Sequence, residues 1–117
     1  MIRILNKSKK EIIIIDNYAD TTLLEIIRDI DKKITLITNK KLLKVIDIEK
    51  YNKQYHNLNI IYNNDFHDRF IILDKEKVYH IGSSINHIGN KVFAINLIEE
   101  ESIKELLINK IKMLDKF

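Results

Sequence analysis

The feature that most constrains the fold is a run of β-branched residues that recurs at helix-length intervals. EIIIID (11–16) is followed by KITLIT (33–38) and then by NLNIIYN (57–63). Short runs rich in isoleucine are typical of strands that are buried in a sheet. The segments between these runs have helical periodicity. The order strand, helix, strand, helix, strand therefore predicts an α/β unit with parallel strands and right-handed crossovers.

Three segments are predicted to be helices because their apolar residues recur every three or four positions. They are TTLLEIIRDIDKK (21–33), KKLLKVIDIEKYNKQY (40–55) and SIKELLINKIKML (102–114). Thr22 and Glu25 fit a capping box at the start of the first helix. Ser102 and Glu105 fit another at the start of the last. We expect the apolar face of the last helix to pack on the sheet, and a surface for a partner helix is the alternative.

In the second half of the chain, predicted strands follow one another without long helices between them. RFIIL (69–73) and VYHIG (78–82) are apolar runs separated by the polar turn DKEK (74–77), and this pattern predicts a hairpin. SSINHIGN (83–90) reads as a loop or a short helical turn, and KVFAINLI (91–98) reads as another strand. The whole pattern predicts an α/β fold with a mixed β-sheet.

Length and composition fit one globular domain over residues 1–117, either alone or as a piece of a longer protein. The net charge of +3 and the pI near 9.0 are compatible with an anionic partner. The absence of cysteine excludes disulfides and thiolate metal sites. No apolar run approaches the roughly 18 residues of a membrane span, and the first residues do not resemble a signal peptide. We therefore expect a cytoplasmic location.

The mouth of the predicted hairpin gathers polar side chains that suit a phosphate ester. Within a strand, alternate residues share a face, so His67 and Arg69 are expected to point the same way. Asp74 lies in the turn, and the end of the second strand returns towards the start of the first. That end contributes Gly82, which gives the backbone room, together with Ser83, Ser84 and Asn86. Basic and amide donors neutralise phosphate oxygens, while a histidine attacks phosphorus or moves protons.

The spacing of these residues resembles the HKD motif of the phospholipase D superfamily. The pattern in this chain is His67-x-Arg69-x(4)-Asp74-x(7)-Gly82-Ser83-x-x-Asn86, and the family pattern is H-x-K-x(4)-D-x(6)-G-S-x-x-N. The match covers residues 67–86 and departs from the family at Arg69, which replaces the lysine. The resemblance implies a phospholipase D-like half-domain, with a mixed β-sheet flanked by helices. HDRF followed by VYHIG also resembles small phospholipase D-like domains of prophage or defence-associated proteins.

The resemblance implies a metal-independent phosphodiesterase or nuclease that needs no cofactor. His67 would attack phosphorus to give a phosphohistidine intermediate, and the histidine of a second motif would protonate the leaving oxygen. Arg69 would hold the phosphate oxygens with help from Ser83 and Asn86, and Asp74 would orient a histidine. Because the chain holds one motif, a C2 homodimer would complete the site. Nucleic acid is favoured over lipid as the substrate because the chain has no membrane segment and no amphipathic basic helix.

The arginine in the lysine position leaves three functions open. Arginine binds phosphate through a bidentate fork, but it is bulkier than lysine and changes where phosphorus sits relative to His67. The chain is either an active phosphodiesterase or a weak or inactive module that binds phosphate or nucleic acid and dimerises. A structural domain whose motif only stabilises a dimer is the third alternative. The candidate substrate contacts are Arg69, Ser84, Asn86 and Tyr18.

Other polar residues have simpler interpretations. Asp68 is expected to form a salt bridge or a hydrogen bond at the strand start, and His80 to lie in the core or on the sheet surface. His56 reads as a surface residue, and His87 as an exposed loop residue or part of a cleft. No compact spacing supports zinc binding by His67 with these groups, so no metal is expected. The lysines that are either solvated surface or phosphate contacts are Lys7, Lys9, Lys10 and those of NKK (39–41).

Overall fold

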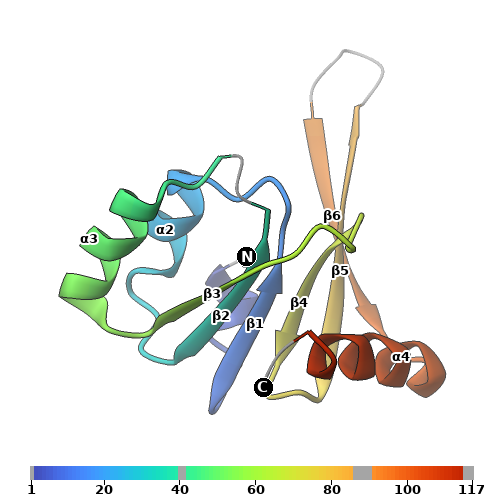
Figure 1. Ribbon diagram of the computed structural model, residues 1–117. Helices are drawn as coiled ribbons and strands as arrows, with labels where there is room; N and C mark the ends of the chain where they lie inside the picture. The colour runs from blue at the N-terminus through green and yellow to red at the C-terminus, as the bar shows by residue number, and fades with distance from the viewer. Residues whose placement is uncertain (1, 40–41, 86–90, 115–117) are drawn as a thin grey trace.

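The computed structural model describes residues 2–39, 42–85 and 91–114 of the chain. They form a six-stranded sheet with the strand order β3-β2-β1-β4-β5-β6 (Figure 1). Its strands are β1 (Glu11–Ile15), β2 (Lys33–Thr38), β3 (Leu58–Tyr62), β4 (Arg69–Leu73), β5 (Lys77–Ile85) and β6 (Lys91–Ile98). β1, β2 and β3 are parallel to one another, while β4, β5 and β6 pair in antiparallel fashion. The predicted α/β class, with parallel strands in the first half of a mixed sheet, is confirmed.

Helices cover both faces of this sheet. Among the described residues they are α1 (Ile2–Leu5), α2 (Thr21–Ile27), α3 (Val45–Tyr55) and α4 (Glu101–Lys112). Ile12 and Ile14 of β1 belong to the hydrophobic cluster that includes α1, α2 and α3. Ile13 and Ile15 belong to a second cluster, with Ile111 of α4, on the opposite face. A strand that is buried on both faces needs apolar residues at every position, which explains the uninterrupted isoleucine run of β1.

Both predicted capping boxes are wrong. Asp20 caps α2, because its carboxylate accepts a 3.0 Å hydrogen bond from the amide of Thr22. Asp20 already stands at the N-cap position, so Thr22 falls inside the first turn. The residue before α4 is Glu100, which makes no side-chain capping bond. Ser102 instead donates a 3.1 Å hydrogen bond to the Glu100 carboxylate.

The helices are also shorter than their apolar periodicity predicts. α2 ends at Ile27, because β2 already begins at Lys33 and the chain must turn between them. α3 begins at Val45, five residues after the predicted start at position 40. The four-residue helix α1 has no recognisable signature in the sequence. Apolar spacing therefore locates these helices but does not fix their ends.

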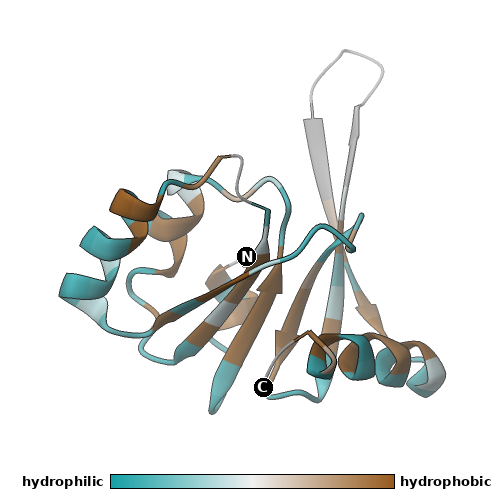
Figure 2. Cartoon of the chain, in the orientation of Figure 1, coloured by the Kyte–Doolittle hydropathy of each residue, from teal (hydrophilic) through white to brown (hydrophobic). Residues whose placement is uncertain are grey.

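The predicted hairpin of β4 and β5 is confirmed, with Arg69 opposite Ile81 and Leu73 opposite Lys77. β5 continues to Ile85, because the long strand β6 pairs with it over residues that were predicted to be a loop. Residues 86–90 of that predicted loop lie outside the described part of the chain. Figure 2 shows hydrophobic residues concentrated in the central strands and hydrophilic residues in the loops at the strand ends. No helix in the described residues is long and apolar enough to cross a membrane.

Candidate functional site

Polar residues gather where the three parallel strands end, and we name residues 16–18, 39 and 62–64 the carboxyl edge. A cleft of about 500 Å³ opens there, lined by Asn17, Tyr18, Asn39, Leu42 and Asn64. The amide of Tyr18 donates a 2.8 Å hydrogen bond to the Asp16 carboxylate. The side-chain amide of Asn17 donates to the carbonyl of Phe66 and so ties this edge to the segment before β4. Tyr18, a predicted ligand contact, is 70% exposed on this edge.

Arg69 lies at the same edge, beside a carboxylate. Antiparallel pairing sets Ile15 opposite Phe70, which brings Arg69 next to Asp16. Burial raises the pKa of Asp16 above its ordinary value, although the hydrogen bond from Tyr18 and the positive charge of Arg69 act in the opposite direction. Because Arg69 sits near this carboxylate, part of its charge is countered within the fold.

His67 lies in the irregular segment before β4 and is exposed. Strand alternation therefore does not set the direction of its side chain, contrary to the expectation that His67 and Arg69 share a strand face. Asp68 lies with its carboxylate 3.8 Å from Nε2 of His80, a contact that agrees with the expectation of a salt bridge or a hydrogen bond for Asp68. The ring of His80 packs on Phe70 with centroids 5.3 Å apart, so His80 is a sheet-surface residue as expected.

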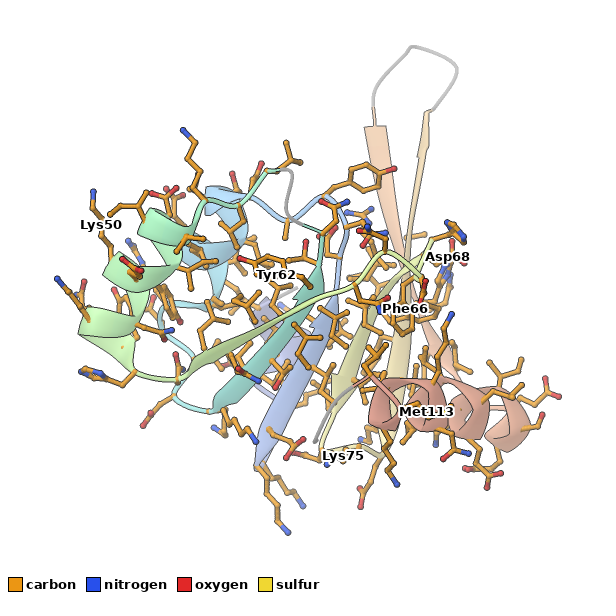
Figure 3. All side chains as sticks on the ribbon, in the orientation of Figure 1. Lys50, Tyr62, Phe66, Asp68, Lys75 and Met113 are labelled. Carbon is orange, nitrogen blue, oxygen red and sulfur yellow. The ribbon has the colours of Figure 1, made fainter. Side chains whose placement is uncertain are left out.

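Asp74 lies at the other end of β4 from His67. The five residues of β4 separate the two ends by about 17 Å. Figure 3 shows Asp68 and Lys75, which flank β4 in the sequence, near the upper and lower ends of that strand. The Asp74 carboxylate accepts hydrogen bonds of 2.7–3.0 Å from the amides of Lys9, Lys10 and Glu11 and from the hydroxyl of Ser8. Although desolvation raises its pKa, these bonds hold the pKa of Asp74 well below its ordinary value.

The remaining motif positions are only partly described. Gly82, Ser83 and Ser84 lie in β5, where Gly82 pairs with Ala94 of β6. The orientation of the two serine side chains lies outside what the structure describes, as do Asn86 and His87 altogether. Of the predicted site, the structure therefore brings Arg69 and Tyr18 to the carboxyl edge and holds Asp74 at the opposite edge.

A second concentration of polar residues lies where the parallel strands begin, and we name residues 9–10, 31–33 and 55–59 the amino edge. A groove of about 660 Å³ runs across it, and we name it the lysine groove. It is lined by Lys9, Lys10, Asp31, Lys32, Lys33, Tyr55, His56, Asn57, Leu58 and Asn59. Four lysines thus face a single carboxylate among the lining residues. None of the four ammonium groups forms an ion pair within the described chain.

Hydrogen bonds fix the main chain beneath these lysines. Asp74 holds the amides of Lys9 and Lys10, while their side chains are exposed. The side-chain amide of Asn57 donates to the carbonyls of Ile30 and Lys32 at 2.8 and 2.9 Å. A fixed main chain limits the conformations that the loops lose when a ligand binds. The groove therefore presents lysine side chains on a fixed main chain to solvent.

The sequence predicted two of the four lysines of this groove as phosphate contacts. Lys9 and Lys10 were among the candidate phosphate contacts, whereas Lys32, Lys33 and the groove-lining His56 were missed. The available signal is that one basic pair stands immediately before β1, a second spans the start of β2, and His56-Asn57 stands before β3. Because the amino ends of parallel strands meet at one edge of a sheet, such pairs come together in space.

The sequence matches no known protein family, and no curated protein matches it either. Among solved structures, its fold is similar to that of TrmBL2, described as an archaeal chromatin protein that shows a novel mode of DNA binding. The two structures align with a TM-score of 0.62 over 96% of this chain, at 20% sequence identity. The chain spans 45% of the length of that protein. A similarity at this identity shows a shared fold.

The expected membership of the phospholipase D superfamily is wrong, because no family matches and the fold resembles that of a DNA-binding chromatin protein instead. The main interpretation as a hydrolytic phosphodiesterase or nuclease with an HKD motif is wrong for the same reason. The physical origin of the resemblance is the hairpin itself. Its turn places Asp74 where a carboxylate can bind main-chain amides of the N-terminal loop. The spacing between His67 and Asp74 therefore reflects the length of β4.

Proposed function

We propose that the chain is a nucleic-acid-binding module that holds a phosphate backbone in the lysine groove. The observation that carries this proposal is the convergence of Lys9, Lys10, Lys32 and Lys33, from the starts of β1 and β2, on one groove with a fixed main chain. The catalytically inactive binding module was the alternative interpretation of the sequence. The similarity of the fold to that of TrmBL2 supports DNA as the nucleic acid to test first.

The chemistry of the groove suits backbone contacts and not base readout. A lysine ammonium is a compact point charge that pairs with phosphate oxygens, and such contacts carry no sequence information. Each neutralised phosphate releases condensed counterions, so binding of this kind weakens steeply as salt rises. The module is therefore expected to bind duplex DNA with little sequence preference.

The test compares two double variants that lose the same charge. Lys10→Gln with Lys33→Gln removes one exposed lysine from each side of the groove, while Lys44→Gln with Lys50→Gln removes two exposed lysines associated with α3. DNA binding is measured by fluorescence anisotropy over a series of salt concentrations. For the groove pair, the slope of log affinity against log salt is expected to fall by about 1.8, because two phosphate contacts are lost.

The α3 pair is the control for net charge. It is expected to leave the slope close to that of the wild type, since neither lysine lines the groove. Equal losses of slope in the two pairs would mean that binding follows overall charge and not the lysine groove. Circular dichroism of all variants checks that the fold is retained.

A further inference from the structure

The outer flank of α4 exposes large apolar side chains. Ile103, Leu106 and Met113 are 45%, 73% and 86% exposed. Together with Phe70 and Leu107 they line a groove of about 490 Å³. The inner face of the same helix is already used, because Ile111 is buried against the sheet. The prediction that α4 packs on the sheet is thus confirmed for one face, and a second apolar face remains in contact with solvent. Contiguous exposed apolar surface is typical of interaction sites.

The charges on α4 are ordered along its length. Glu101 lies in the first turn, and Lys110 and Lys112 lie in the last. Lys104 forms an ion pair with Glu101 at 3.2 Å, so these two charges offset each other and Glu105 leaves the first half acidic. A helix that is acidic at its start and basic at its end complements a second copy of itself in the antiparallel orientation. The opposed helix dipoles favour the same orientation.

The spacing of the exposed residues points to one position for a two-fold axis. Leu106 and Met113 are seven residues apart, so they lie on the same side of the helix. Glu105 and Lys112 are also seven residues apart and form a charged row beside the apolar pair. A two-fold axis near Asn109 sets Leu106 opposite Met113 of the second copy and brings Glu105 close to Lys112 of the second copy. An amide both donates and accepts hydrogen bonds, so Asn109 can pair with its own copy.

We propose that α4 is the interface of a C2 homodimer, in which the two α4 helices pack antiparallel with Leu106 and Met113 at the centre. A second copy is the occupant because its apolar pair and its row of opposite charges complement those of the first copy on rotation by a half-turn. α4 is about 18 Å long, so the contact is smaller than a standard protein interface. The dimer is therefore expected to dissociate in the micromolar concentration range.

Sedimentation velocity without nucleic acid, over a range of protein concentrations, tests the dimer separately from the proposed function. The wild-type mass is expected to rise with concentration from 13.9 kDa towards twice that value. Leu106→Glu buries a charge in the interface and is expected to remain monomeric. Leu42→Glu is the matched control, since Leu42 is a 51% exposed leucine outside α4. A wild type that stays monomeric at every concentration would overturn the proposal, as would a Leu106→Glu protein that still dimerises.

Charge reversal tests the antiparallel arrangement itself. Glu105→Lys sets like charges against each other across the interface and is expected to weaken the dimer by about tenfold or less, the range of exposed ion pairs. Adding Lys112→Glu restores opposite charges in the antiparallel arrangement and is expected to recover most of the loss. A double variant that dimerises no better than Glu105→Lys alone would exclude this arrangement. Circular dichroism checks helix content in each variant.

Discussion

The two edges of the sheet hold positive charge in different ways. At the amino edge, hydrogen bonds from Asp74 and Asn57 fix the main chain, and the lysine ammonium groups remain in solvent. At the carboxyl edge, Arg69 sits beside the half-buried carboxylate of Asp16. A charge that is countered within the fold contributes less to the external field than one that faces solvent. The difference teaches that the arrangement of basic residues, more than their number, decides where an anionic partner binds.

The largest expected effect on DNA affinity comes from removing the positive charge of the lysine groove at the amino edge. A variant with glutamine at positions 9, 10, 32 and 33 loses the four lysines of the groove. Its affinity for duplex DNA is expected to fall on the order of 100-fold at low salt, and its salt slope by about 3.6. Electrophoretic mobility shift and anisotropy titrations measure both quantities. Unchanged affinity would show that the proposed contrast between the edges is false.

Asp74→Asn is expected to have the next largest effect, and on stability. An asparagine side chain is uncharged, so it accepts weaker hydrogen bonds from the amides of Lys9, Lys10 and Glu11 than the carboxylate does. The N-terminal loop is therefore held less firmly. The melting temperature is expected to fall by on the order of 5 °C. Asp29→Asn is the control, since Asp29 is exposed and its carboxylate lies 3.9 Å from Arg28. Equal melting temperatures for Asp74→Asn and the wild type would mean that the hydrogen bonds to the Asp74 carboxylate do not stabilise the amino edge.

The stability supplied by Asp74 is expected to depend on pH. The pKa of its carboxyl group in the folded protein lies well below its ordinary value. The charged form therefore stabilises the fold at neutral pH, and this stabilisation is lost as pH falls from about 4 towards the folded-state pKa. Urea titrations of the wild type and Asp74→Asn should show a constant difference near pH 7 and a smaller one in acid. A difference that widened in acid would contradict the assigned direction.

The smallest expected effect comes from the carboxyl edge. Arg69→Gln should change the affinity for duplex DNA by less than about twofold, because no phosphate contact is lost in the proposed complex. The same substitution should raise the pKa of Asp16 further, since the charge of Arg69 lowers it in the wild type. Carboxyl carbon NMR titration measures this pKa. A loss of affinity as large as that of the groove variant would move the binding site to Arg69 and Tyr18.

Local patterns predicted much of the fold. The isoleucine run of β1 and the polar turn between β4 and β5 each determine an element within a few residues, and both are observed. The helix caps were not predictable in this way, because Asp20 and Thr22 are both acceptable capping residues and only the backbone path decides between them. The spacing of hydrophobic residues in the sequence thus locates helices and strands better than it locates their ends.

The candidate site was harder to predict because its contacts are distant in sequence. Asp74 lies more than 60 residues from the amides it binds, so its spacing from His67 carried no information about its partners. The motif predicted a site around His67 and Arg69, and Arg69 lies at the carboxyl edge. The proximity of the basic pairs at the starts of β1 and β2 follows instead from the sheet topology.

The strand order also bears on how the chain folds as it is synthesised. β1 is the first strand in the chain but occupies an interior place in the sheet, between β2 and β4. Its second neighbour, β4, is made only after residue 68. Until then, one side of a strand with four consecutive isoleucines offers unpaired amides and carbonyls to another chain. The interval between the synthesis of β1 and that of β4 is therefore one in which β1 can pair with a strand of another chain.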